Sequence, residues 1–189
     1  MPSPSTWVVF AFDWTRYRGI GPRLQAACGT GDFTSLGIPG ADAVLDTLED
    51  DRTPEEVCNV LLAELCGRGE PVTVPGALLG VLRQIRRNRD CEEAADLLTE
   101  LLVGGSNVAP WFRTGHALVG LLTPEQTRAL ALRLGRFCRR AAPAARPGGL
   151  RSLWRLFSPS DEETVVLHAL RDLVDEAAAR GDGLAAAVD

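Results

Sequence analysis

The stretch that decides the fold is LLTPEQTRALALRLGRFC, residues Leu121–Cys138, because it contains the clearest helix start in the sequence. Thr123 stands in the N-cap position, where its side chain can accept a hydrogen bond from a first-turn backbone N–H. Pro124 follows at the first helical position, where no backbone donor is needed, and Gln126 completes a capping box. The stretch predicts a surface helix with one buried face.

Apolar residues recur at helical spacing behind this cap, and we expect them to form the buried stripe. They are Leu130, Leu132, Leu134 and Phe137. Arginines flank the stripe and predict a cationic face that meets an anion or an acidic partner. The candidate interaction residues are Arg128, Arg133, Arg136, Arg139 and Arg140.

Charge is distributed unevenly along the chain. Residues 41–56 contain seven acids and one arginine, whereas residues 127–160 contain eight arginines and no acid. Arginine forms two-pronged hydrogen bonds with carboxylates, so we expect Arg136, Arg139 and Arg140 to face an acidic surface. That surface is either the 42–56 segment of the same chain or a partner protein.

Length and composition indicate one globular domain over residues 1–189, with a tail at 1–5 and a connector at 141–149. No window approaches the roughly 18 uncharged apolar residues of a membrane span. The first residues lack the basic region of a signal peptide, so a cytoplasmic location is expected. The absence of lysine is typical of a bacterial, actinobacterial-like genome of high GC content, and all 20 basic residues are arginine.

Several kinds of chemistry are unavailable to this composition. Without lysine there is no Schiff base and no P-loop lysine. The five cysteines form no CxxC pair and there are only two histidines, so no metal and no cofactor is expected. We interpret the cysteines as reduced, buried small hydrophobes.

The fold class predicted is α+β and predominantly helical, with helices packed on a small sheet. The best strand is 6–13, an apolar run of the kind found at the centre of a sheet, and 183–188 is a second candidate strand. Residues 116–122 are either a short strand or an extended lead-in. Glycines and a proline at 19–22 predict an interrupted helix after Asp13. Further helices are predicted at 41–48, 53–66, 74–89, 91–103 and 160–180.

The loop 104–115, whose one charged residue is an arginine, and the residue that follows it contain the one cluster of aromatic, basic and histidine side chains in the sequence. It consists of Trp111, Phe112, Arg113 and His116. One interpretation is the lip of a pocket for a small anionic ligand, to which Asp13 would add a carboxylate. The other is that Trp111 and Phe112 plug the core, where large aromatic side chains usually lie.

The two ends of the chain together resemble a known family. A short strand that ends in an acid leads into a helix, and a Leu-Thr-Pro-Glu-Gln helix start, a connector and an Ala-Ala-Ala-Arg-Gly-Asp-Gly helix end follow much later. Over residues 6–18 and 118–188 the chain resembles the YfbM-like family of uncharacterised bacterial proteins. The resemblance implies a mixed α/β domain whose N- and C-terminal strands pair. The family has no established activity, so no functional residues carry over.

The function predicted is that of an interaction or accessory protein without catalytic activity, with a protein partner or a second copy of the chain. The first alternative is a small-ligand-binding protein or enzyme with its pocket around residues 104–116. The second is nucleic-acid binding through residues 128–155, which the negative net charge of −5 and the lack of interleaved aromatics disfavour.

Overall fold

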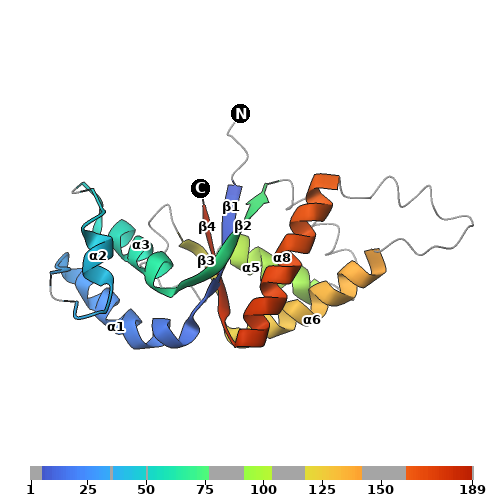
Figure 1. The fold of residues 1–189 in the computed structure, drawn as a ribbon, viewed down its shortest axis with the longest axis horizontal. Helices are drawn as coiled ribbons and strands as arrows, with labels where there is room; N and C mark the ends of the chain where they lie inside the picture. The colour runs from blue at the N-terminus through green and yellow to red at the C-terminus, as the bar shows by residue number, and fades with distance from the viewer. Residues whose placement is uncertain are drawn as a thin grey trace, which may run out of the picture.

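The computed structural model describes residues 6–34, 36–49, 51–76, 92–103, 118–141 and 161–188, and these form an α+β fold dominated by helices (Figure 1). In chain order the elements are β1 (Thr6–Phe12), α1 (Trp14–Thr30), α2 (Ala41–Leu45), α3 (Pro54–Cys66), β2 (Gly67–Pro75), α5 (Glu92–Val103), β3 (Leu118–Leu122), α6 (Pro124–Ala141), α8 (Asp161–Arg180) and β4 (Gly183–Val188).

Four strands form one antiparallel sheet in the order β2-β1-β4-β3. The first strand of the chain pairs with the last, with Trp7 opposite Val188 and Phe12 opposite Gly183. This arrangement confirms the predicted strands at both ends of the chain. It also places β1 inside the sheet, as its continuous apolar run predicts.

Helices cover both faces of the sheet, and alternate side chains of β1 enter two separate cores. Val9 and Ala11 pack with α5, α6 and α8 on one face, hereafter the α6 side. Phe10 and Phe12 pack with α1, α2 and α3 on the other face, the α3 side. In Figure 1 the two groups of helices lie to the right and to the left of the strands.

The capping box predicted at the start of α6 is present. The Thr123 backbone N–H donates to Gln126 Oε1 at 2.9 Å, and the Gln126 N–H donates to Thr123 Oγ1 at 3.3 Å. Leu130 and Leu134 are fully buried, as predicted. The prediction for Leu132 is wrong, because its side chain is 66% exposed. It lies two residues from both buried leucines, about 200° around the helix, on the opposite face.

Helix α1 runs through residues 19–22 without the predicted interruption. Pro22 lies inside the helix and removes one backbone hydrogen bond. Burial outweighs this loss, because Ile20 and Leu24 enter the core on the α3 side. The absence of a side chain at Gly21 leaves room for the Tyr17 ring, which lies 3.4 Å from the place of a Cβ.

Strand β2 was not predicted, because its sequence GRGEPVTVP is rich in residues that disfavour strands. Pairing with β1 overrides this preference: Val9 lies opposite Val72, and Val74 is buried on the α6 side. The pairing of β2 with β1 shifts register between Arg68 and Val72, and Gly69 within this shift has a φ of 73°. The prediction of a helix from Val74 is therefore wrong at its start, and its remainder from 77 onward lies outside the described residues.

We expect Val9→Asp to prevent folding, because it buries an unpaired charge in an inner strand. Val9 is completely buried, and the substitution should cost several kcal/mol, comparable with the whole net stability. Circular dichroism melts of the purified variant measure the effect. Thr73→Asp on the exposed side of β2 is the control and should cost about 1 kcal/mol or less. A Val9→Asp variant that melts like the wild type would contradict this account of the core.

A pair of glycine substitutions tests how closely α5 approaches the sheet. A Cβ added at Gly120 would lie 2.1 Å from the Leu101 carbonyl oxygen, whereas a Cβ at Gly19 would meet nothing within 4 Å. Gly120→Ala should therefore destabilise the protein by about 2–3 kcal/mol. Gly19→Ala, in the middle of α1, should stabilise it by about 0.5–1 kcal/mol. Urea unfolding measures both, and equal effects of the two substitutions would show that α5 does not pack there.

Candidate functional site

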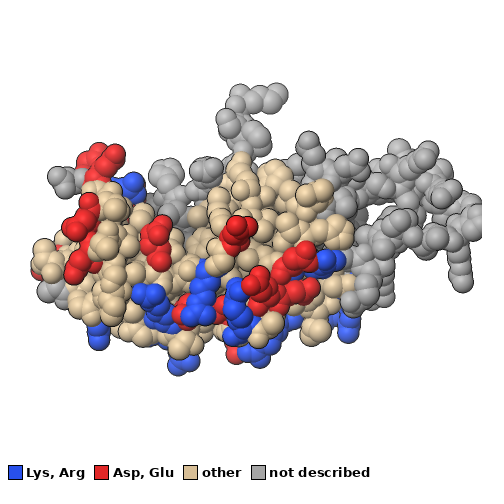
Figure 2. Space-filling view, viewed as in Figure 1, with Lys and Arg blue, Asp and Glu red and all other residues tan. Residues whose placement is uncertain are grey.

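The end of β1 and the starts of β2 and β4 lie side by side at one end of the sheet. Phe12 at the end of β1 lies opposite both Gly67, which begins β2, and Gly183, which begins β4. The antiparallel register therefore brings together the neighbours of these residues, Asp13, Arg68 and Asp182. Figure 2 shows arginine and acidic side chains intermixed over this region and α8, in the lower middle of the view.

Asp13 connects the end of β1 to the start of α1. Its Oδ1 accepts a hydrogen bond from the Arg16 backbone N–H at 2.8 Å, which makes it the N-cap of the helix. Its own backbone N–H donates to the Cys66 carbonyl at 2.8 Å. Oδ2 accepts from Nη2 of Arg68. Both carboxylate oxygens of this buried residue are thus engaged in holding the fold.

Arg68 and Arg180 extend this contact into an ion-pair network, hereafter the strand-end cluster. Arg68 Nη1 donates to Asp182 Oδ1 at 3.4 Å, and Arg180 Nε donates to Asp182 Oδ2 at 2.8 Å. Arg180 Nη1 also donates to Glu176 Oε1 at 2.5 Å. The cluster therefore links β1, β2 and the α8–β4 junction through side chains that are far apart in the sequence.

The electrostatics of the cluster indicate a structural role. Asp13 and Asp182 are 9% and 4% exposed, and carboxylates so buried need partners. The hydrogen bond to Asp182 raises the pKa of Arg180, so this guanidinium stays charged. Arg68 keeps 48% of its side chain exposed, so water screens its ion pairs and limits their contribution. Arg68 and Asp182 were not predicted as site residues, because only the register of the strands brings them together.

The predicted ligand pocket lies almost wholly outside the described residues. Trp111, Phe112, Arg113 and His116 all belong to the segment 104–117, which the structure does not describe. Asp13 is the one member whose position is known, and its carboxylate serves the strand-end cluster. The pocket around residues 104–116 stays a prediction.

Three of the five arginines of α6 have described side chains, and one of these three forms a close ion pair with another described residue. Arg133 reaches Glu93 of α5 with an Nη2–Oε2 distance of 2.5 Å, which ties the two helices together. Among the described residues, Arg128 approaches one carboxylate, that of Glu125, at 4.0 Å, and its side chain is 56% exposed. Arg136 is exposed, and no carboxylate of the described residues pairs with it. The side chains of Arg139 and Arg140 lie outside the described residues.

The fold separates this helix from the acidic segment of the same chain. Ala41, Val44 and Val57 pack on the α3 side, whereas Leu130 and Leu134 of α6 pack on the α6 side. Acidic side chains gather over α2 and the start of α3, on the left in Figure 2. The interpretation that the 42–56 segment neutralises the α6 arginines is therefore wrong for Arg128, Arg133 and Arg136. For Arg139 and Arg140 it falls outside the described side chains, and the alternative of an acidic partner protein stays a prediction.

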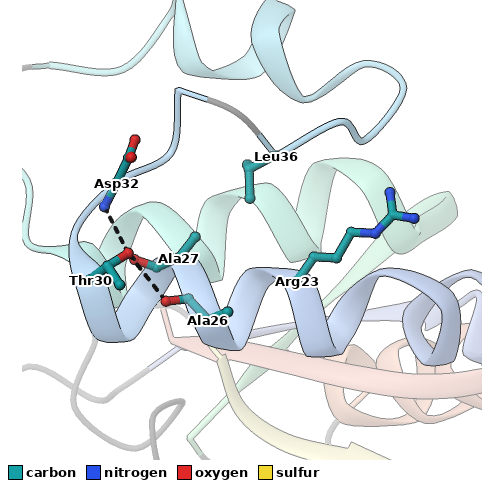
Figure 3. Close-up of a pocket in the computed structure, with 6 residues that line it drawn as sticks. All are labelled: Arg23, Ala26, Ala27, Thr30, Asp32 and Leu36. Atoms are coloured by element: carbon teal, nitrogen blue, oxygen red, sulfur yellow. Dashed lines mark hydrogen bonds between the residues drawn. The ribbon is translucent and has the colours of Figure 1, made fainter.

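A shallow cavity of about 430 Å³ lies between α1 and the loop that follows it (Figure 3). Its lining consists of Arg23, Ala26, Ala27, Thr30, Asp32 and Leu36. Its two charged residues already bind the protein: Arg23 Nη1 donates to the Gly37 carbonyl at 3.0 Å, and Asp32 Oδ1 accepts from the Thr34 hydroxyl at 2.6 Å. The lining offers no cluster of uncommitted polar groups for a ligand.

The described part of the chain contains neither a metal-binding cluster nor a membrane-spanning helix. No three His, Cys, Asp or Glu side chains there are grouped so that they could bind a metal ion. Every helix there is too short or too polar to span a lipid bilayer.

Comparison with known proteins adds no assignment: no family model, no curated protein and no solved structure matches the chain. The resemblance to the YfbM-like family therefore stays a prediction. The pairing that it implies between the first and the last strand is nevertheless present in the sheet.

Removing one carboxylate tests the strand-end cluster. Asp182→Ala leaves Arg68 and Arg180 without their shared buried partner and should destabilise the protein by about 1–2 kcal/mol, allowing for the exposure of the arginines. Asp172→Ala, which removes the 67% exposed partner of Arg171, is the matched control and should cost less than about 0.5 kcal/mol. Urea denaturation measures both. Equal stability losses would show that the cluster is no more than a set of surface contacts.

Proposed function

We propose that the protein acts without catalysis, as an interaction module that binds an acidic protein partner through the outer face of α6. The observation that supports this proposal is the exposure of Leu132, whose side chain is 66% accessible in the middle of a helix whose other described leucines are buried. Arg128 and Arg136 lie one turn to either side of it. We call these three residues the α6 recognition face.

The spacing of the three residues places them in one row. Positions i−4, i and i+4 lie on the same side of an α-helix, with Cβ atoms about 5–6 Å apart from turn to turn. Leu130 and Leu134 hold the opposite side of α6 in the core, so the row faces solvent. The recognition face is thus presented by a helix whose orientation is set by its packing.

The chemistry of the row fits an acidic partner with an apolar cleft or groove. A leucine that is covered on binding contributes apolar burial at the centre, and arginines at the rim form two-pronged hydrogen bonds with carboxylates. The contact of Arg128 with Glu125 is long, and Arg136 is paired with no carboxylate in the described part of the chain. Neither arginine therefore has to give up a strong ion pair on binding.

Affinity capture with a matched pair of variants tests this proposal. The wild type, the variant Arg128→Glu/Leu132→Asp/Arg136→Glu and the control Arg18→Glu/Arg52→Glu are immobilised and exposed to bacterial lysate. The control reverses two exposed arginines outside α6. Proteins that only the wild type and the control capture are purified and titrated by calorimetry. We expect at least a tenfold loss of affinity for the α6 variant, and weaker wild-type binding at high salt.

Three outcomes would contradict the proposal. The first is capture that the α6 variant retains in full. The second is binding of duplex DNA or single-stranded RNA by the wild type that the α6 variant loses, which would assign the arginines to phosphates. The third is 1:1 binding of a small anion that quenches tryptophan fluorescence and is unaffected by the α6 substitutions, which would favour the ligand pocket around 104–116. Melting curves of all variants establish that each is folded.

A further inference from the structure

Two cysteines that are 30 positions apart in the sequence meet where α1 packs against α3. The Cys58 thiol on α3 donates a hydrogen bond to the Leu24 carbonyl of α1, with a sulfur–oxygen distance of 3.4 Å. Leu24 lies one helical turn before Cys28 on the same helix, so this contact places the Cys58 sulfur beside Cys28. Cys58 belongs to the core on the α3 side, and Cys28 is partly buried against the same core.

The two thiols differ in their access to solvent. Cys28 is half-buried, whereas Cys58 is completely buried, and both are free in the structure. A reagent from solution therefore reaches Cys28 first. Once Cys28 is modified, the thiol near it is that of Cys58. Cys66 is a free thiol on the same helix as Cys58, is also completely buried, and serves as an internal reference.

We propose that Cys28 is a site of thiol oxidation by small disulfides and that Cys58 resolves it, so that a Cys28–Cys58 disulfide joins α1 to α3. This inference is independent of the α6 recognition face, because the cysteines lie on the opposite side of the sheet.

The reaction is two successive thiol–disulfide exchanges. Cys28 loses its proton to solvent, and its thiolate attacks one sulfur of the small disulfide. The small disulfide bond breaks, one small thiolate leaves, and a mixed disulfide forms on Cys28. Cys58 then loses its proton and attacks the Cys28 sulfur, which releases the second small thiolate. The two cysteine thiols are oxidised, and the small disulfide is reduced to two thiols.

The surroundings of the pair predict a slow reaction. Burial raises the pKa of the Cys28 thiol, and the Glu55 carboxylate raises it further against the lowering effect of the hydrogen bond with Cys58. Burial also raises the pKa of the Cys58 thiol, and the neighbouring Cys28 and Glu55 raise it further. A raised thiol pKa means less reactive thiolate at neutral pH, so the rate of oxidation should increase as the pH rises.

The disulfide would constrain a defined part of the fold. It would close the segment between residues 28 and 58, which contains the loop after α1, helix α2 and the start of α3. Arg16 and Arg23 of α1 already hold that loop through the Pro39 and Gly37 carbonyls, at 3.0 Å each. The packing of α1 against α3 already places Cys58 near Cys28 in the folded protein, so the disulfide would mainly restrict the unfolded chain.

The test uses the full-length reduced protein and glutathione disulfide at pH 8 under native conditions. Free thiols are then alkylated, and the protein is digested and mapped by mass spectrometry without reduction. We expect a peptide pair linked through Cys28 and Cys58, with Cys66 alkylated only after denaturation. The oxidised protein should melt roughly 5–10 °C above the same sample treated with dithiothreitol.

Two variants separate the roles of the thiols. Cys58→Ser, whose hydroxyl can still donate to the Leu24 carbonyl, should retain glutathione on Cys28, and Cys28→Ser should leave Cys58 unmodified. The proposal is overturned if wild-type Cys28 retains glutathione, if it fails to react, if the bridge forms to another cysteine, or if oxidation leaves the melting temperature unchanged. The wild-type map decides the question even if a serine variant does not fold.

Discussion

The pairing of the first strand with the last is the constraint on which the rest of this structure depends. It makes β1 and β4 the two inner strands of the sheet, so the chain can complete its core only when both ends are in place. The alternation of side chains along β1 then supplies both cores, one to each face. The same register brings Asp13, Arg68 and Asp182 together and so creates the strand-end cluster.

The two sides of the sheet carry different chemistry. Acidic side chains gather over α2 and the start of α3 (Figure 2), whereas Arg128, Arg133 and Arg136 belong to α6, which packs on the opposite face of the sheet. The sheet and its two cores separate these charges, so they do not neutralise each other within the fold. Arg128 and Arg136 form no close ion pair with the described part of the chain, which is why we propose the α6 recognition face as the binding surface.

One buried polar group in the described part of the chain has no explanation in the structure. The side-chain oxygen and nitrogen of Asn59 on α3 are both buried, and neither has a hydrogen-bond partner. An unpaired buried amide is costly, so its presence in an otherwise apolar helix face is unexpected. We have no physical account of it and assign it no role.

Features that depend on residues close together in the chain could be predicted from the sequence. The capping boxes at Thr53 and Thr123 and the buried leucines of α6 follow from local spacing, and the apolar run of β1 follows from composition. Other features required the tertiary structure, because they depend on contacts between residues that are distant in the sequence. Strand β2 forms against its own propensity because β1 supplies the pairing, and α1 continues through Pro22 because the core covers it. The strand-end cluster, the contact of Cys28 with Cys58 and the exposure of Leu132 likewise depend on which faces and strand ends the fold brings together.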